Sequence, residues 1–262
     1  MKNFFSALYT ESLKAFRSRV PLFTTLGFLI APLIGGLFMI ILKDPAAAKS
    51  MGLIGAKAQL AMGTADWPTL FNFLGQAVAV GGAMVFAIIT IWVFGREFSD
   101  HTVKELLSLP TPRESIVAAK FVVIAIWTAL LTTLNFGVGI LAGNFVVIPG
   151  WSLELFHSAT VDILGAGALT ILLLPIVAFV ASSGRGFMPA FDWTIFTVVI
   201  AQIAAIMGWG GWLPWSIPAL FSGAAGPPAD YLGIYSYVIV ILASLMGLFA
   251  TFYWWRNADQ TK

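Results

Sequence analysis

The chain has 262 residues, of which 59% are hydrophobic and only 10% are charged, and its mean hydropathy is +0.92. Soluble domains carry about a quarter charged residues, so this composition excludes an ordinary soluble protein and predicts an all-α polytopic membrane protein. The formal net charge of +2 comes from bases scattered over loops beside apolar runs, which argues against a nucleic-acid partner. Cysteine is absent, so no disulfide or thiolate metal site is available.

The first 19 residues place apolar side chains at helical spacing, with basic residues between and after them. This pattern predicts an amphipathic helix over residues 1–19 that lies in the membrane surface. The alternative is a charged flank of the first span. The apolar run that follows, 21–42, is longer than the core of a signal peptide, so we expect a retained span.

Six apolar runs are each long enough to cross roughly 30 Å of hydrocarbon at about 1.5 Å per residue. They cover residues 21–42, 71–94, 116–141, 161–182, 190–210 and 231–253. We therefore expect one transmembrane domain over residues 1–262 and no soluble domain. Charges within the runs, at Lys120, Asp162 and Asp192, lie near the run ends, because a charge at mid-bilayer costs about 2.5 kcal/mol or more.

The distribution of basic residues predicts the orientation of the spans. Of the 14 Lys and Arg residues, four lie in the N-terminal segment and four between Arg96 and Lys120. One more, Arg185, lies between the fourth and fifth spans, and two lie in the C-terminal tail. The other three lie in the first outer loop. By the positive-inside rule, both termini and the second-to-third connection are predicted to be cytoplasmic.

The outer loops contain two notable segments. Residues 46–62 form an alanine-rich, weakly amphipathic stretch that predicts a short outer helix. Residues 208–221 are aromatic and rich in Gly and Pro, which predicts a re-entrant segment between spans five and six that is surrounded by protein. The alternative for 208–221 is an aromatic belt that anchors the sixth span.

Uncharged polar residues occur within the spans, and we expect most of them to form hydrogen bonds between helices. They are Asn72, Gln76, Thr90, Thr128, Thr132, Thr133, Asn135, Thr170, Thr194, Gln202, Ser236 and Ser244. A minority is expected to line a substrate path, for which the candidates are Asn72, Gln76, Thr90, Asn135 and Gln202. A path without fixed charges suits an amphipathic or apolar cargo.

The connection between the second and third spans, residues 95–115, is the most charged part of the chain. Opposite charges four residues apart, Arg96 with Asp100 and Asp100 with Lys104, predict a helix that continues to about Leu109. The sequence Thr111-Pro112-Arg113-Glu114 predicts a capping box that starts the next helix. A solvated juxtamembrane loop is the alternative.

The residue inventory argues against an enzyme. The two histidines, His101 and His157, are expected on opposite sides of the membrane, so no metal site is predicted. No nucleotide-binding or nucleophile motif is present, and no cofactor is expected in this chain. An energised function therefore needs a partner chain.

With these features the chain resembles the permease subunit of ABC-2-type ABC transporters over its whole length. The matching residues are Gly95-Arg96-Glu97-Phe98, Thr102-Val103-Lys104-Glu105, Leu109-Pro110 and Arg113. The resemblance implies a coupling helix between spans two and three that docks on a separate ATPase. The implied coupling residues are Arg96, Glu97, Asp100, Thr102, Lys104, Glu105, Leu107, Pro110 and Arg113.

The resemblance also implies two ATPase copies that bind ATP and Mg²⁺, a second permease chain in a homodimer, and a plasma-membrane location in a bacterium or archaeon. The cavity between the two permeases is then formed by spans one, two and five, with the 208–221 segment at the outer gate. The expected cargo is an amphipathic or hydrophobic peptide or drug, moved outward. The alternative function is a membrane scaffold or immunity protein that binds cargo without moving it.

Overall fold

The computed structural model describes residues 2–44, 52, 63–103, 105, 111–223 and 232–257. This part of the chain is helical and contains no strand. The helices are α1 (Lys2–Arg17), α2 (Val20–Lys43), α5 (Trp67–Gln76), α6 (Gly82–Ser99), α8 (Arg113–Val146), α9 (Leu153–Ser183), α10 (Met188–Ile206), α11 (Ile217–Phe221) and α12 (Ile234–Asn257). A π-helical turn, η1 (Ala77–Gly81), joins α5 to α6, and the 3-10 turns η2 (Gly210–Trp212) and η3 (Pro214–Ser216) precede α11.

Six helical segments are long and apolar enough to cross a membrane, which confirms the number and order of the predicted spans. They are Val20–Lys43, Trp67–Ser99, Arg113–Val146, Leu153–Ser183, Met188–Ile206 and Ile234–Asn257. The second span begins four residues earlier than predicted because Asp66 caps it: the Asp66 carboxylate accepts a hydrogen bond from the Thr69 backbone N–H at 2.9 Å.

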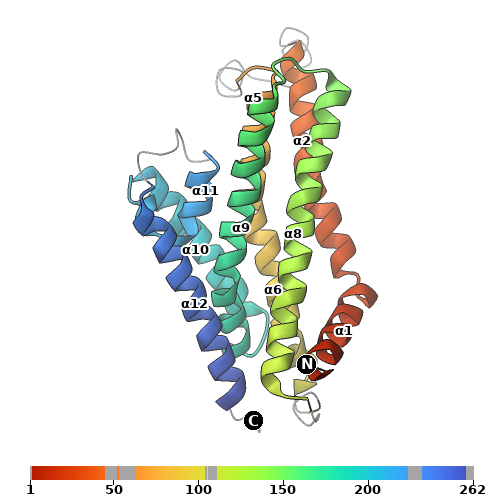
Figure 1. The fold of residues 1–262 in the computed structure, drawn as a ribbon, viewed down its shortest axis with the longest axis vertical. Coiled ribbons are helices and arrows are strands. Elements are labelled where there is room, and N and C mark those ends of the chain that lie inside the picture. The colour runs from red at the N-terminus through yellow and green to blue at the C-terminus, as the bar shows by residue number, and fades with distance from the viewer. Residues whose placement is uncertain are drawn as a thin grey trace.

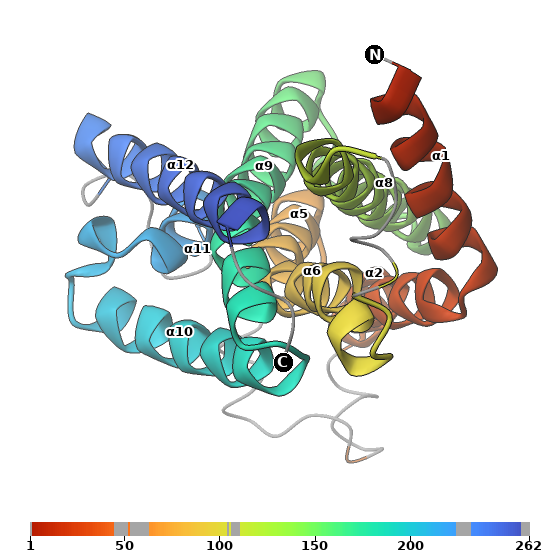
Figure 2. The same ribbon diagram turned by 90° about the horizontal axis from the view of Figure 1, so that it is seen from below.

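The long helices run side by side, and the start of α1 and the end of α12 lie at the same end of the bundle (Figure 1). This end, called the terminal end below, also carries the end of α6 and the start of α8. Helix α1 does not continue the line of α2 but lies obliquely beside α8 and α2 (Figures 1 and 2). Seen from the terminal end, α10 and α12 form one side of the molecule with α11 between them (Figure 2).

Small residues set the closest helix contacts. A Cβ added at Gly247 of α12 would lie 2.6 Å from the backbone N of Ile176 and 2.7 Å from the carbonyl carbon of Pro175, both in α9. At the same crossing, the Thr251 hydroxyl donates to the Pro175 carbonyl at 3.3 Å. Helix α12 therefore packs against α9 backbone to backbone.

The prediction that span hydroxyls join neighbouring helices is wrong for most of them. Six threonine hydroxyls instead donate to the carbonyl four residues earlier in their own helix: those of Thr90, Thr128, Thr132, Thr133, Thr170 and Thr194. A hydroxyl on Cβ reaches that carbonyl without moving the backbone, so it forms a hydrogen bond within its own helix instead of one to a neighbouring helix. Ser236 does bond to another element, through the Gly211 carbonyl at 2.8 Å.

The segment from Gly208 to Phe221 is irregular and well packed. Gly210, Gly211 and Ser216 are buried, and the Ser216 hydroxyl donates to the carbonyl of Gly210. The turns η2 and η3 contact α10, while α11 contacts α9. This burial agrees with the expectation that protein surrounds the segment, but only in part, because Trp209 and Trp212 are exposed. The predicted helix over 46–62 lies outside the described residues, apart from residue 52.

The α9–α12 crossing gives a test of the packing. We expect Gly247→Ala to destabilise the protein by about 1–3 kcal/mol, because its Cβ meets backbone atoms that cannot rotate away. Gly27→Ala is the matched control: Gly27 lies in α2 with no atom within 4 Å of an added Cβ, so helix propensity should raise stability by up to about 1 kcal/mol. Thermal unfolding of the two detergent-purified variants measures both effects; equal unfolding temperatures would contradict this packing.

Candidate functional site

One face of α1 is built to approach α8 closely. Ala7, Glu11 and Ala15 recur every four residues and are all buried. Ala7 packs with Ile116 and Ala119 of α8. Because the alanines flanking Glu11 have short side chains, the α1 backbone comes near enough for the Glu11 carboxylate to reach into the bundle.

The Glu11 carboxylate meets Lys120, whose side chain is fully buried one and a half to two turns into α8. The Lys120 Nζ lies 3.0 Å from Glu11 Oε2, 2.7 Å from Glu97 Oε1 of α6, and 2.7 Å from the Val93 carbonyl oxygen. An ammonium group has three N–H donors, and each therefore has an acceptor. One cation thus joins α1, α6 and α8.

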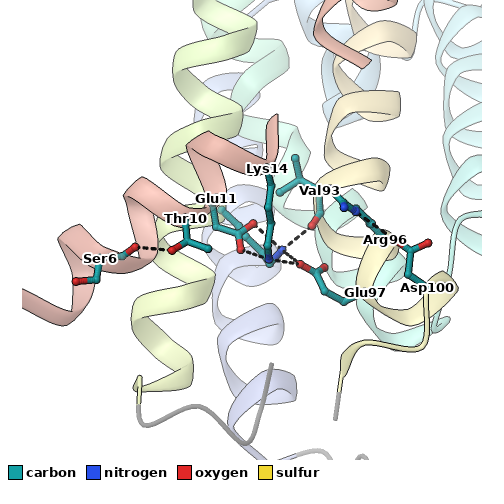
Figure 3. A network of polar contacts seen from close by, with 9 residues as sticks. Ser6, Thr10, Glu11, Lys14, Val93, Arg96, Glu97 and Asp100 are labelled. Carbon is teal, nitrogen blue, oxygen red and sulfur yellow. Dashed lines mark hydrogen bonds and ion pairs between the residues drawn. The ribbon is translucent and has the colours of Figure 1, made fainter. Parts of the chain in front are cut away.

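A second lysine closes the arrangement. Lys14 Nζ lies 2.7 Å from Glu11 Oε1 and 3.1 Å from Glu97 Oε1, so each carboxylate is shared by two ammonium groups (Figure 3). We call Glu11, Lys14, Glu97 and Lys120 the ion cluster. Its two positive and two negative charges balance, and only Lys14 is appreciably exposed, with 28% of its side chain accessible.

Burial makes the ion cluster costly to open. Removing an ion from water costs several kcal/mol, and this cost is offset only while the partners stay in contact. Glu97 Oε2 is buried without a hydrogen-bond partner in the described part of the chain, so one acceptor of the ion cluster is left unsatisfied. Helix α1 is therefore held to α6 and α8 by interactions that have no good substitute in the lipid.

Helix α6 ends just beyond the ion cluster, at Ser99, so the predicted helix is interrupted there. Val103 and Glu105 are helical again, and the predicted end near Leu109 lies outside the described residues. The Thr102 N–H donates to the Glu97 carbonyl and the His101 N–H to the Phe98 carbonyl, which is the Schellman arrangement. It requires a left-handed residue, here His101 with φ of 57°. Glycine usually fills this position, so the sequence carried no stop signal.

The predicted coupling residues divide into exposed and buried groups. Arg96 Nε pairs with Asp100 Oδ2 at 3.2 Å, as predicted, with 36% and 52% of the side chains exposed. Thr102 and Glu105 are also exposed. Glu97, next to Arg96, faces the opposite way into the ion cluster. Lys104, Leu107 and Pro110 lie outside the described residues.

Arg113 is placed against the end of the last span. Its Nη1 donates to the carbonyls of Trp255 and Arg256, each at 3.3 Å, so this cation satisfies open acceptors at the α12 C-terminus. The predicted capping box at Thr111 is wrong: Pro112 is the N-cap residue of α8 and no side chain caps the helix. The Pro112 carbonyl instead accepts the first backbone bonds, from Ser115 and Ile116.

The five candidate path residues are not brought together. Asn72 and Gln76 are exposed on α5 and line a pocket of about 370 Å³ beside α2. Gln202 lies in a separate small hollow between α10 and the Gly208–Phe221 segment. Thr90 is buried and bonded within α6, and Asn135 is buried in α8 with neither amide atom hydrogen-bonded in the described structure.

Sequence reasoning missed Glu11, Lys14 and Lys120 as members of one site. The available signal was Lys120 itself, since a cation inside an apolar run requires a partner. Glu11 lies 109 positions away along the chain, so no local pattern identifies it as that partner. Within the described residues, no group of three or more acidic or histidine side chains offers a metal site.

Lys120 gives a test of the ion cluster. Lys120→Met should destabilise the protein by about 3–5 kcal/mol, because Glu11 and Glu97 lose their buried counter-ion. Lys14→Met removes the same charge from a partly exposed position and should cost clearly less. Thermal unfolding in detergent compares the two variants, and a larger loss for Lys14→Met would overturn the ranking.

Asn135 gives an opposite expectation. Asn135→Leu should raise the unfolding temperature by about 2–4 °C, because a buried amide without partners costs about 1 kcal/mol or more. Asn144→Leu is the control on the same helix, since Asn144 is exposed and bonded to the Ile140 carbonyl. The expectation fails if the unfolding temperature of Asn135→Leu is no higher than that of the control, Asn144→Leu.

The comparisons with known proteins agree with this architecture. The pattern of the ABC-2 family transporter proteins matches residues 7–203, which includes the ion cluster and the α6–α8 connection. The chain is similar to the bacitracin transport permease protein BCRB of Bacillus licheniformis, with 28% identity over 183 residues, covering 68% of this chain and 85% of that protein. No solved structure matches the chain significantly.

Permeases of this family carry no nucleotide-binding domain, which agrees with the prediction that the chain is not an enzyme. The family membership also implies an ATPase partner. With the family pattern over most of its length and six candidate spans, this chain belongs to the ABC-2 family and is a multi-pass membrane permease subunit of an ABC transporter.

Proposed function

We propose that the chain forms the translocation path of an ATP-driven exporter for an amphipathic or hydrophobic peptide or drug. The observation that supports this most directly is the ion cluster, which ties the end of α6 to α1 and α8 in a chain of this family. The similarity to a bacitracin transport permease favours a peptide antibiotic as cargo. Uncharged path candidates such as Gln76 and Gln202 suit such a molecule.

In this proposal the terminal end of the bundle is cytoplasmic, in agreement with the excess of Lys and Arg predicted there. Two ATPase subunits then meet two permease chains at the α6–α8 connections. Exposed Arg96, Asp100, Thr102 and Glu105 make the contact, and Lys104, Leu107 and Pro110 remain predictions.

Glu97 has a different role in the proposal from its neighbours. Its carboxylate faces Lys120 and Lys14, so it acts as a positioning residue that passes movement of the connection to α1 and α8. Arg113 acts similarly toward α12. In this proposal, a movement that the ATPase imposes on the exposed residues displaces α6, α8, α1 and α12 together.

The second permease copy is proposed to cover apolar faces that this chain leaves open. Helix α2 exposes Leu22, Leu26 and Leu33 on one side, and α10 exposes Phe196 and Ile203. Together with α6, these helices would enclose the cavity of a homodimer. The segment Gly208–Phe221 is proposed to dip into the outer leaflet and close the outer end of that cavity.

Transport in proteoliposomes tests the proposal. The tagged chain is purified in mild detergent with the ATPase that accompanies it, reconstituted, and supplied with ATP and bacitracin as the probe peptide. We expect ATP-dependent movement of the peptide, and no ATP hydrolysis by the permease alone. Binding of bacitracin without ATP-dependent movement would favour a scaffold or immunity protein instead.

The coupling surface is tested in the same assay. Asp100→Lys should reduce transport about tenfold or more without lowering the unfolding temperature, because Asp100 is exposed and makes one surface ion pair. Glu154→Lys reverses an exposed charge at the opposite end of the bundle and should transport normally. Normal transport by Asp100→Lys would remove Asp100 from the coupling surface.

A further inference from the structure

A basic pocket lies between α1 and α6, beside the ion cluster. It has a volume of about 320 Å³, room for roughly ten water molecules at about 30 Å³ each. Three cationic side chains line it, Lys14, Arg17 and Arg96, together with Thr10, Ser18 and Trp92. The pocket contains none of the candidate path residues, and it shares Arg96 with the proposed ATPase contact.

The pocket has more hydrogen-bond donors than its own acceptors satisfy. Lys14 Nζ uses two of its three N–H groups on Glu11 and Glu97, which leaves one. Arg96 bonds to Asp100 through Nε only, and its guanidinium carbon lies 5.2 Å from the centre of the Trp92 ring. Among the described residues Arg17 has no ion pair or hydrogen bond to an acidic group.

The charges around the pocket do not cancel. Glu11 and Glu97 are both held at short distance by Lys120, whose ammonium group faces the protein interior. Asp100 is the other acidic group that pairs with a lining residue in the described part of the chain, and it is half exposed. Arg17 and part of the Arg96 guanidinium are therefore left for an anion from outside the chain.

The surroundings of the pocket point to the membrane as the source of that anion. Helix α1 exposes Phe5, Tyr9 and Phe16, which places it at the lipid surface. Two residues after Ser18 the apolar span α2 begins, with Leu22 and Phe23 exposed. The pocket thus lies where headgroups end and acyl chains begin, and Trp92 is a side chain suited to that depth.

We propose that this basic pocket binds the phosphate group of an anionic phospholipid, with the acyl chains on the exposed apolar surface beside it. Arginine presents paired N–H groups that match phosphate oxygens, and basic pockets between helices at the membrane boundary suit anionic headgroups. The bound lipid would hold α1 to α6 next to the ion cluster. The proposal does not depend on the ATPase or on cargo transport.

Native mass spectrometry of the purified permease tests it directly, with phosphatidylglycerol and phosphatidylcholine as probe lipids. We expect the wild-type chain to retain phosphatidylglycerol about fivefold better than phosphatidylcholine. Arg17→Gln should lose about that factor, and Arg17→Lys should keep most of it because the charge remains. Arg19→Gln is the matched control, an exposed arginine two positions away that does not line the pocket.

A competition arm separates the lipid from a soluble phosphate. Glycerol phosphate at the lipid concentration should leave the lipid bound, because it lacks acyl chains. Displacement of phosphatidylglycerol by glycerol phosphate would assign the pocket to a soluble phosphate and overturn the lipid. Equal losses for Arg17→Gln and Arg19→Gln, or no loss for Arg17→Gln with an unchanged unfolding temperature, would overturn the site itself.

Discussion

The buried ammonium group of Lys120 is the constraint on which the terminal end of the molecule depends. A cation at this depth is tolerated only if every N–H has an acceptor, and those acceptors come from two other helices. Helix α1 is amphipathic and is joined to this ammonium group through Glu11. Withdrawing Glu11 would leave Lys120 with Glu97 as its remaining carboxylate partner and one N–H without an acceptor.

Two adjacent residues of α6, Arg96 and Glu97, form ion pairs with different partners. Arg96 faces outward to Asp100, while Glu97 faces inward to Lys120 and Lys14. The Schellman motif that ends α6 uses the Glu97 carbonyl as well, so the start of the connection is bonded to the same residue as the ion cluster. Glu97 thus contacts α1 and α8 through its carboxylate and the start of the connection through its carbonyl, as the proposed positioning role requires.

Much of the fold could be predicted from the sequence because hydrophobic span length is a strong signal. The six spans, their order and the Arg96–Asp100 pair are all found in the structure. Helix ends were harder to predict, since His101, Val147 and Arg185 take positive φ values that usually favour glycine.

The candidate site was harder to predict for a different reason. Its residues are far apart in the sequence, since Glu11 and Lys120 are separated by more than a hundred positions. The sequence near Lys120 therefore does not indicate which acidic residue pairs with it. The prediction of hydrogen bonds between helices was also wrong for most threonines, because a threonine hydroxyl can donate to a carbonyl of its own helix. A polar residue in a span therefore indicates a need for a partner, not which helix supplies it.

The hydrogen bonds and ion pairs between helices are concentrated at the two ends of the bundle, and its middle is mainly apolar. At the terminal end lie the ion cluster, the bonds of Arg113 to the end of α12, and the Trp255–Ser182 bond at 2.9 Å. At the other end Lys43 of α2 donates to the Val146 carbonyl of α8 at 2.6 Å.

Between these ends most threonine hydroxyls bond within their own helices, with the Thr251–Pro175 contact of α12 and α9 as an exception, so the described spans meet there mainly through apolar side chains and small residues. Such surfaces can shift against each other without breaking a hydrogen bond in lipid, where a lost bond costs most. The π-helical turn at Ala77–Gly81 lies in this middle region, and π-turns inside α-helices are frequent at functional sites. In the proposed mechanism, a movement that enters at the terminal end would have few hydrogen bonds between helices to break in the middle of the bundle.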